Sequence, residues 1–182
     1  MSPQLAALTL YLRLVNKPQL ARETDLPRLR DRFTAKARLL FRDPRGADFR
    51  EIDGATWCGP RDGAGAILYL HGGGFIMGSP RTHRHLAARV ALAAGAPAMV
   101  ARYRLAPEHP HPAQIEDALA AYAGILGRGP VAVAGDSAGG GLAFALVVAA
   151  RAAGLPDPAC VVGFSPWCDM TGRRPTLRSN AR

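Results

Sequence analysis

The stretch Val131-Ala-Val-Ala-Gly-Asp-Ser-Ala-Gly-Gly-Gly-Leu142 decides the fold of this chain. Residues 131–134 are small and apolar and predict a buried strand, and residues 138–153 predict the helix that follows it. Between them, Gly135-Asp-Ser-Ala-Gly139 fits the G-x-S-x-G elbow, in which a serine lies on a sharp turn. The helix would direct the positive end of its dipole at Ser137, where negative charge develops during acyl transfer. Ser137 is therefore a candidate nucleophile.

Two nucleotide-binding interpretations of this glycine-rich turn fail on their own patterns. A P-loop needs a lysine and then a serine or threonine after Gly140, but Gly141 and Leu142 stand there. A dinucleotide-binding fingerprint needs a glycine where the chain has Ser137. The remaining alternative is a strand-to-helix turn in which the serine is incidental.

A second glycine-rich segment makes that alternative weaker. In Ile67-Leu-Tyr-Leu-His-Gly-Gly-Gly-Phe75 an apolar strand again runs into consecutive glycines. Such a loop lets backbone N–H groups approach a substrate closely, as stabilisation of an oxyanion requires. His71 either braces this loop by hydrogen bonding or is a satisfied, partly buried imidazole. Its place at the end of the strand argues against a role as general base.

Together the motifs resemble the hormone-sensitive-lipase-like family of α/β-hydrolases, also called GDXG lipolytic enzymes. The resemblance runs from about Leu39 to the last residue. It is carried by the following blocks, in order: His71-Gly-Gly-Gly-Phe75 with Ser79, Thr82 and His83 behind it, Tyr103-Arg-Leu-Ala-Pro-Glu-His109, Gly135-Asp-Ser-Ala-Gly-Gly140, and a weaker Ser165-Pro-Trp-Cys-Asp169.

The resemblance implies an α/β fold with three layers and a mostly parallel sheet. It implies a carboxylic-ester hydrolase, esterase or lipase, that acts on small-molecule esters with short to medium acyl chains and needs no cofactor. Ser137 would be the nucleophile, and the N–H groups of Gly73, Gly74 and Ala138 would form the oxyanion hole. His71 and Gly72 would support the loop.

The chain departs from the family pattern after Ser137. The triad of this fold follows the order serine, acid, histidine, yet all five histidines precede Ser137. Only two acids follow it, Asp157 and Asp169, and Asp169 is better interpreted as a loop carboxylate that accepts hydrogen bonds from nearby backbone. We therefore expect the front part of an esterase, truncated after about the sixth strand. The alternative is a catalytically impaired fragment or a non-catalytic binding protein that lacks the triad acid and histidine.

Periodicity predicts amphipathic helices in the N-terminal part and alternating strands and helices after it, and the resemblance implies a helical cap segment at residues 1–45 and an incomplete α/β-hydrolase domain at residues 46–182. The cap segment would hold two amphipathic helices, the first with Leu5, Leu8, Leu12 and Val15 on one face, the second behind Asp25 and Pro27 with a stripe of Leu26, Leu29, Phe33, Ala37 and Leu40. In the family such helices shape the acyl pocket, although helices that merely cover the sheet would look the same. The domain would contain a hairpin at 50–53 and 55–58, strands at 67–70, 97–101 and 160–164, and helices at 80–94 and 112–126.

Composition fits a globular chain of one main domain, with 48% hydrophobic and 20% charged residues. The net charge of +9 comes mostly from arginines, which are not interleaved with stacking aromatic residues, so we expect solvated helix faces and no nucleic-acid partner. The run from Leu5 to Val15 is too short to span a membrane. We expect self-association through an exposed edge of the sheet.

The remaining polar groups support no metal site. The pairs His83/His85 and His109/His111 lack a framework of carboxylates around them, so we expect no bound metal. Arg104 and Glu108 are expected to form a structural ion pair.

The three cysteines lack zinc spacing and indicate no disulfide framework, which fits a cytoplasmic protein. Cys160 is expected to be a small core residue.

Overall fold

The computed structural model describes residues 2–173 and contains a six-stranded sheet with the order β1-β2-β4-β3-β5-β6. Strands β3, β4, β5 and β6 run parallel, whereas β2 pairs antiparallel with both β1 and β4. This confirms the α/β fold class. The strands are β1 (Asp48–Ile52), β2 (Ala55–Gly59), β3 (Ala66–Leu70), β4 (Ala98–Val100), β5 (Val131–Asp136) and β6 (Cys160–Phe164).

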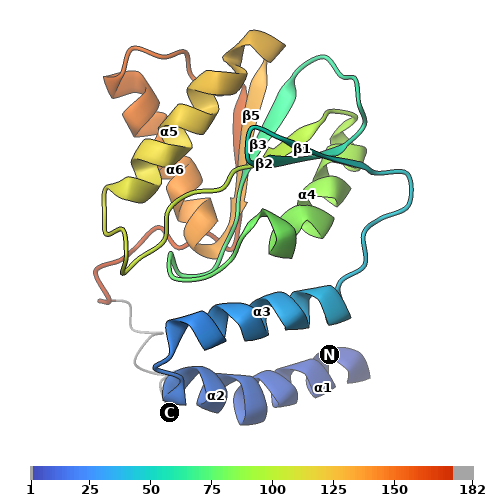
Figure 1. Cartoon of the computed structure of the whole chain (residues 1–182), viewed down its shortest axis with the longest axis vertical. Helices are drawn as coiled ribbons and strands as arrows, with labels where there is room; N and C mark the ends of the chain where they lie inside the picture. The colour runs from blue at the N-terminus through green and yellow to red at the C-terminus, as the bar shows by residue number, and fades with distance from the viewer. Residues whose placement is uncertain (1, 174–182) are drawn as a thin grey trace.

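Helices cover both faces of the sheet and complete three layers (Figure 1). Helix α4 (Pro80–Ala94) lies on one face, where its alanines pack against Tyr69 and Val100. Two helices lie on the other face, α5 (Ala113–Ile125) and α6 (Ser137–Ala152). Helix α5 continues into a 3₁₀ turn, η2 (Leu126–Arg128). The larger core cluster forms there from Leu68, Leu70, Tyr122, Val133 and Leu146, all nearly or fully buried. Because both faces are covered, the central strands are apolar throughout.

Local sequence signals fix the ends of the helices. The Ser79 hydroxyl accepts a hydrogen bond from the Thr82 N–H at 3.3 Å, and Thr82 returns the contact, which completes a capping box at the start of α4. Gly95 ends the same helix in the left-handed region at φ +63°. Asp25 caps helix α3 (Leu26–Leu40) with Pro27 in its first turn, as the sequence predicts.

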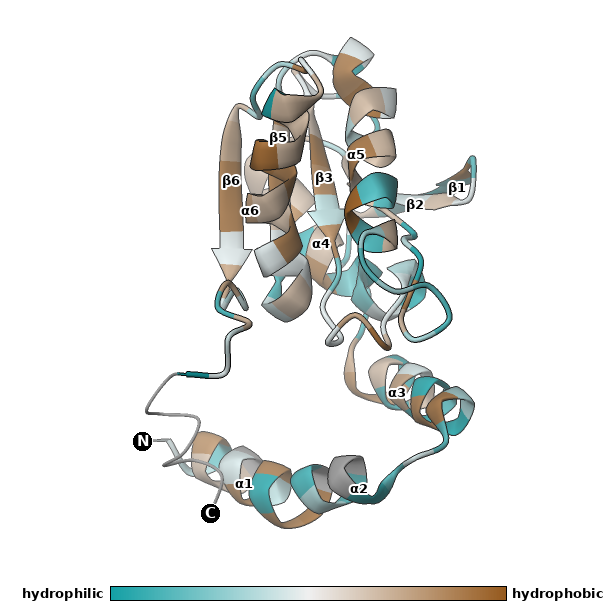
Figure 2. Ribbon diagram, turned by 90° about the vertical axis from the view of Figure 1, so that its left-hand side faces the viewer, coloured by the Kyte–Doolittle hydropathy of each residue, from teal (hydrophilic) through white to brown (hydrophobic). Residues whose placement is uncertain are grey.

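The N-terminal helices lie beyond one end of the sheet (Figures 1 and 2). Helix α1 (Pro3–Tyr11) runs through a π-helical turn, η1 (Leu12–Asn16), into α2 (Lys17–Arg22). The Lys17 N–H bonds back to Leu12, five residues earlier. Pro18 follows directly and has no N–H to continue the regular ladder, which accounts for the wider turn at this point.

The two stripes expected on these helices differ in burial. On α3, Leu29 and Ala37 are buried and Phe33 is partly buried, while Leu40 is exposed. In the first stripe, the side chain of Leu8 lies outside the described residues, and Leu5, Leu12 and Val15 are exposed, so these three positions are not covered by the rest of the described chain. Periodicity gives the direction of an apolar face, but it does not say what covers the face.

Strand β6 forms one edge of the sheet, with α6 beside it (Figure 2). The expectation that Cys160 is a core residue was wrong, because the cysteine is exposed, and within residues 2–173 its strand pairs with β5 alone. Val162 and Phe164 are also exposed, at 42% and 40%. An apolar edge strand with free backbone groups favours pairing with another chain.

We predict that a polypeptide of these 182 residues self-associates through β6. Val162→Lys should weaken the association, because a charge on an edge strand opposes strand pairing. Leu39→Lys is the matched control, since Leu39 is 82% exposed on α3, away from the sheet. Sedimentation velocity over a range of concentrations measures the effect. A monodisperse monomer with one sharp thermal transition would contradict the prediction.

Candidate active site

Ser137 lies where the sequence places it, on the turn between β5 and α6. It is exposed and has φ +51°, a left-handed conformation that non-glycine residues rarely adopt. The turn requires glycine at positions 135 and 139, because a side chain at either would collide with backbone carbonyl groups, including that of Leu70. The Ser137 carbonyl accepts a hydrogen bond from the Trp167 N–H at 2.8 Å. The strained turn therefore presents the hydroxyl at the carboxyl end of the sheet.

The glycine loop after β3 meets this turn. Leu70 pairs with Gly135, so the residues that follow the two strands emerge side by side. Gly73 and Gly74 have φ +127° and +62°, and the loop closes with a hydrogen bond from the Met77 N–H to the Gly73 carbonyl at 3.1 Å. Within residues 2–173, no hydrogen bond uses the N–H of Gly73, Gly74 or Ala138. These donors are free to bind an oxygen atom of a ligand.

The carboxylate of Asp136 joins the loop to the elbow. Its Oδ1 accepts hydrogen bonds from the Gly72 N–H at 3.0 Å and from the Tyr69 hydroxyl at 2.9 Å. Nε2 of His83 lies 3.5 Å from Oδ2. Burial opposes ionisation of this carboxyl group, but the contacts with His83, Tyr69 and Gly72 outweigh it and hold the pKa below its ordinary value. The sequence motif contains Asp136, but sequence reasoning assigned it no role.

His71 braces the loop from behind and is also fully packed. Its Nδ1 lies 2.9 Å from the Gly72 carbonyl, and its ring stacks on Tyr103 with centroids 4.2 Å apart. The Tyr103 hydroxyl donates to the His71 carbonyl at 2.5 Å. Burial lowers the pKa of His71 to about 4, so the imidazole is neutral at pH 7 and Nδ1–H donates to Gly72. The sequence suggested either a hydrogen bond to the loop or a buried, satisfied imidazole, and His71 has both features.

The acids after Ser137 are engaged elsewhere. Oδ1 of Asp169 accepts hydrogen bonds from the N–H and hydroxyl of Thr171, at 2.9 and 2.6 Å, which agrees with its interpretation as a loop carboxylate. Asp157 forms an exposed ion pair with Arg151. Neither has a contact with Ser137 among the interactions of the described residues.

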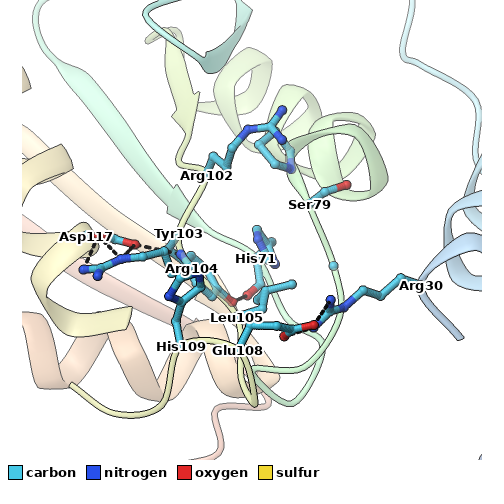
Figure 3. A pocket seen from close by; sticks show the side chains of 12 residues that line it. Arg30, His71, Ser79, Arg102, Tyr103, Arg104, Leu105, Glu108, His109 and Asp117 are labelled. Carbon is cyan, nitrogen blue, oxygen red and sulfur yellow. Dashed lines mark hydrogen bonds and ion pairs between the residues drawn. The ribbon is translucent and has the colours of Figure 1, made fainter. Parts of the chain in front are cut away.

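The expected ion pair between Arg104 and Glu108 was wrong. Arg104 instead binds Glu116 and Asp117 on α5. Figure 3 shows the pair with Asp117 and the pair that Glu108 forms with Arg30 of α3. Spacing along the chain suggested the pair, but the loop between β4 and α5 turns the two side chains toward different helices.

An apolar cavity of about 470 Å³ borders the glycine loop. It lies between the loop, α5, α6 and the segment after β6, within the range of small-molecule sites. Its lining residues are mostly apolar: Gly74, Phe75, Ala106, His111, Gln114, Ile115, Gly141, Leu142, Ala145, Trp167 and Met170.

The described part of the chain contains neither a cluster of metal-binding side chains nor a helix that could span a membrane. No group of three or more histidine, cysteine, aspartate or glutamate side chains is arranged to hold a metal ion within residues 2–173. In the same range, every helix is too short or too polar to cross a bilayer.

Comparison with known proteins identifies the family. The sequence profile of the α/β-hydrolase fold matches residues 67–182, more than half of the chain, and the chain belongs to this family. It is 49% identical over 121 residues to an acetyl-hydrolase of Streptomyces hygroscopicus and 41% identical over 132 residues to the esterase LipI of Mycobacterium tuberculosis. These matches cover 64% and 68% of this chain, and 40% and 41% of the relatives.

Solved structures agree and confirm the resemblance to hormone-sensitive-lipase-like enzymes. An esterase/lipase from an uncultured bacterium shares 37% identity at a TM-score of 0.87, covering all of this chain and 64% of the other. A hormone-sensitive lipase from a metagenome library shares 34% at a TM-score of 0.87, covering 98% and 62%. The chain thus spans about two fifths of the curated relatives and just under two thirds of the solved structures.

The Asp136 contacts predict a pH-dependent contribution to stability. Asp136→Ala should destabilise the fold by about 1–3 kcal/mol for each donor left without a partner. Asp136→Asn keeps an acceptor but loses the charge. Because the folded pKa is depressed, the stabilisation by the charge is present above about pH 4 and is lost as the pH falls through the folded value.

Urea unfolding at pH 7 and pH 3 measures this difference. The deficit of Asp136→Asn relative to the parent should be present at pH 7 and shrink at pH 3. Asp157→Asn, which breaks only an exposed pair, is the control and should change little. An equal deficit of Asp136→Asn at both pH values would show that the charge contributes nothing.

Proposed function

We propose that this chain supplies the nucleophile and the oxyanion hole of a carboxylic-ester hydrolase. The observation that carries the proposal is the division of amides around the elbow. Asp136 occupies the N–H of Gly72, while those of Gly73, Gly74 and Ala138 have no partner among residues 2–173. They lie beside an exposed serine in a strained turn, at the positive end of α6. This is the arrangement that acyl transfer through an oxyanion requires.

In the proposed reaction, the Ser137 hydroxyl oxygen attacks the ester carbonyl carbon and its proton passes to a base. The carbonyl oxygen gains negative charge and accepts hydrogen bonds from Gly73, Gly74 and Ala138. The tetrahedral intermediate then collapses, the ester C–O bond breaks, and the alcohol leaves with a proton. Water attacks the acyl-serine in the same way and releases the carboxylic acid and free Ser137.

The apolar cavity beside Gly74 supports a short or medium acyl ester as substrate. Its volume of about 470 Å³ and its lining by Phe75, Leu142, Trp167 and Met170 suit a small hydrocarbon chain. EstE5, a solved relative at 37% identity, was soaked with p-nitrophenyl butyrate, an activated ester of this size. We propose the same ester as the first probe for this chain.

The base is the open part of the mechanism, because among residues 2–173 no histidine forms a hydrogen bond with Ser137. His71 is buried and neutral behind the loop, and His83 faces Asp136. His111 lines the apolar cavity and His109 a separate one. This observation favours the second candidate function, a binding module that keeps the ester pocket without efficient turnover.

The remaining proposals concern organisation and location. We propose that residues 1–45 act as a cap segment, because α3 packs on α4 and binds the loop that follows β3. All three cysteines are free thiols, which supports a reducing compartment such as the cytoplasm.

Hydrolysis by the 182-residue polypeptide is expected to be weak but real. Oxyanion stabilisation and binding alone leave a rate on the order of 10³–10⁴ over water when a triad member is missing. The initial rate with p-nitrophenyl butyrate measures it, and Ser137→Ala should keep a similar residual rate because oxyanion stabilisation and binding do not need the serine. Added imidazole, as an external base, should raise the rate of the parent above that of Ser137→Ala, and this difference is the Ser137-dependent rate.

Two results would change this assignment. Equal rates for the parent and Ser137→Ala in the presence of imidazole would rule out Ser137 as the nucleophile. A turnover number typical of efficient enzymes, lost in Ser137→Ala, would show that a residue of this chain acts as base, with His111→Ala and His109→Ala as the next variants.

The oxyanion hole is tested by adding a side chain to the loop. Gly74→Val should lower the Ser137-dependent rate on the order of 100-fold, because a branched side chain enters the site of the substrate oxygen. Gly95→Val is the matched control, since Gly95 has nearly the same φ, +63° against +62°, and open space around it at the far end of α4. The control should lose similar stability and keep the rate. Equal rates for the two variants would overturn the assignment of Gly74.

A further inference from the structure

Arg30 of helix α3 contacts three residues in two separate segments of the chain with one guanidinium group. Its Nη1 and Nη2 each lie 2.8 Å from an oxygen of Glu108, which makes a bidentate ion pair (Figure 3). Its Nε donates to the carbonyl of Ile76 at 2.7 Å, and Nη2 also donates to the carbonyl of Ala106 at 3.0 Å. The side chain is only 27% exposed, although it belongs to a surface helix.

These contacts reach the loop that carries the free amides. Ile76 lies two residues after Gly74, and its own N–H bonds back to Gly73 at 3.2 Å. The Ala106 N–H binds the Phe75 carbonyl at 2.8 Å, so the 105–108 segment holds the same loop from the other side. Any displacement of Arg30 is therefore transmitted to the residues that flank Gly74.

We propose that Arg30 is a positioning residue for ester hydrolysis, which couples the docking of α3 to the conformation of the glycine loop. The inference rests on the proposed function of that loop. Arg30 does not touch the reacting atoms. It acts through the carbonyl of Ile76, which it holds while Glu108 fixes the orientation of the guanidinium plane.

The geometry requires arginine. The guanidinium is planar and presents its donors in a fixed fork, so one side chain can bind a carboxylate and two carbonyls together. A lysine ammonium can pair with Glu108 as a point charge, but it cannot hold Ile76 and Ala106 in the same orientation. The hydrogen bond from Arg30 lowers the pKa of Glu108 to about 2, so the pair stays ionised at neutral pH.

The difference between arginine and lysine separates positioning from simple docking. Arg30→Lys should keep a thermal midpoint close to that of the parent, because the charge pair with Glu108 survives. Hydrogen exchange of the 72–78 segment, followed by mass spectrometry, should accelerate roughly tenfold through loss of a charge-assisted bond to the loop. The Ser137-dependent kcat for p-nitrophenyl butyrate should fall on the order of 10- to 100-fold, with little change in KM. Arg30→Ala should show both effects and a lower midpoint.

Arg32→Ala is the matched control. Arg32 lies on the same helix and pairs with Glu23 at 2.9 Å, with no bond to the loop, so its removal should leave loop exchange and kcat unchanged. The proposal is overturned if Arg30→Lys matches the parent in both measurements, or if Arg30→Ala lowers the midpoint while loop exchange equals that of Arg32→Ala. Ser137→Ala runs alongside: full activity in that variant would reject the proposed nucleophile, whereas the exchange data would still show whether Arg30 holds the loop.

Discussion

The carboxylate of Asp136 is the constraint on which the rest of the site depends. Pairing of Leu70 with Gly135 brings the ends of β3 and β5 together, but register alone leaves the two loops free to move against each other. Asp136 limits that freedom because it directly precedes Ser137 in sequence and its carboxylate accepts a hydrogen bond from the N–H of Gly72. The contact also explains why position 72 is glycine, since a side chain there would collide with the carboxylate.

The glycine loop is thus held at both ends by charged groups, and its middle is left free. Asp136 holds the first glycine, and Arg30 holds the carbonyl of Ile76. Between these points lie Gly73 and Gly74, whose positive φ values only glycine adopts without strain. Such an arrangement is pre-organised: the donors need no rearrangement when charge develops on a substrate, which is the main source of oxyanion stabilisation in enzymes.

The sequence predicts the parts of this site that are local. Apolar runs ending in glycine define β3 and β5, and the elbow motif locates Ser137, because each depends on a few consecutive residues. The ties between those parts are not local. Arg30 and Glu108 are 78 residues apart, and nothing in either segment indicates the partner. For the same reason the spacing of Arg104 and Glu108 gave a wrong pair. The exposure of Cys160 likewise follows from the position of β6 in the sheet, which an apolar pattern does not specify.

A negative charge directly before Ser137, the proposed nucleophile, would by itself oppose the formation of an oxyanion nearby, because like charges raise the energy of the second ion. Hydrogen-bond donors around the carboxylate reduce this effect. Tyr69, Gly72 and His83 all contact the Asp136 carboxylate and compensate its charge. The free amides of Gly73, Gly74 and Ala138 and the positive end of α6 remain for the substrate. The backbone amides thus serve two anions. The N–H of Gly72 binds the permanent carboxylate of Asp136, which fixes the loop, and those of Gly73, Gly74 and Ala138 are left for the oxyanion that forms during the proposed reaction.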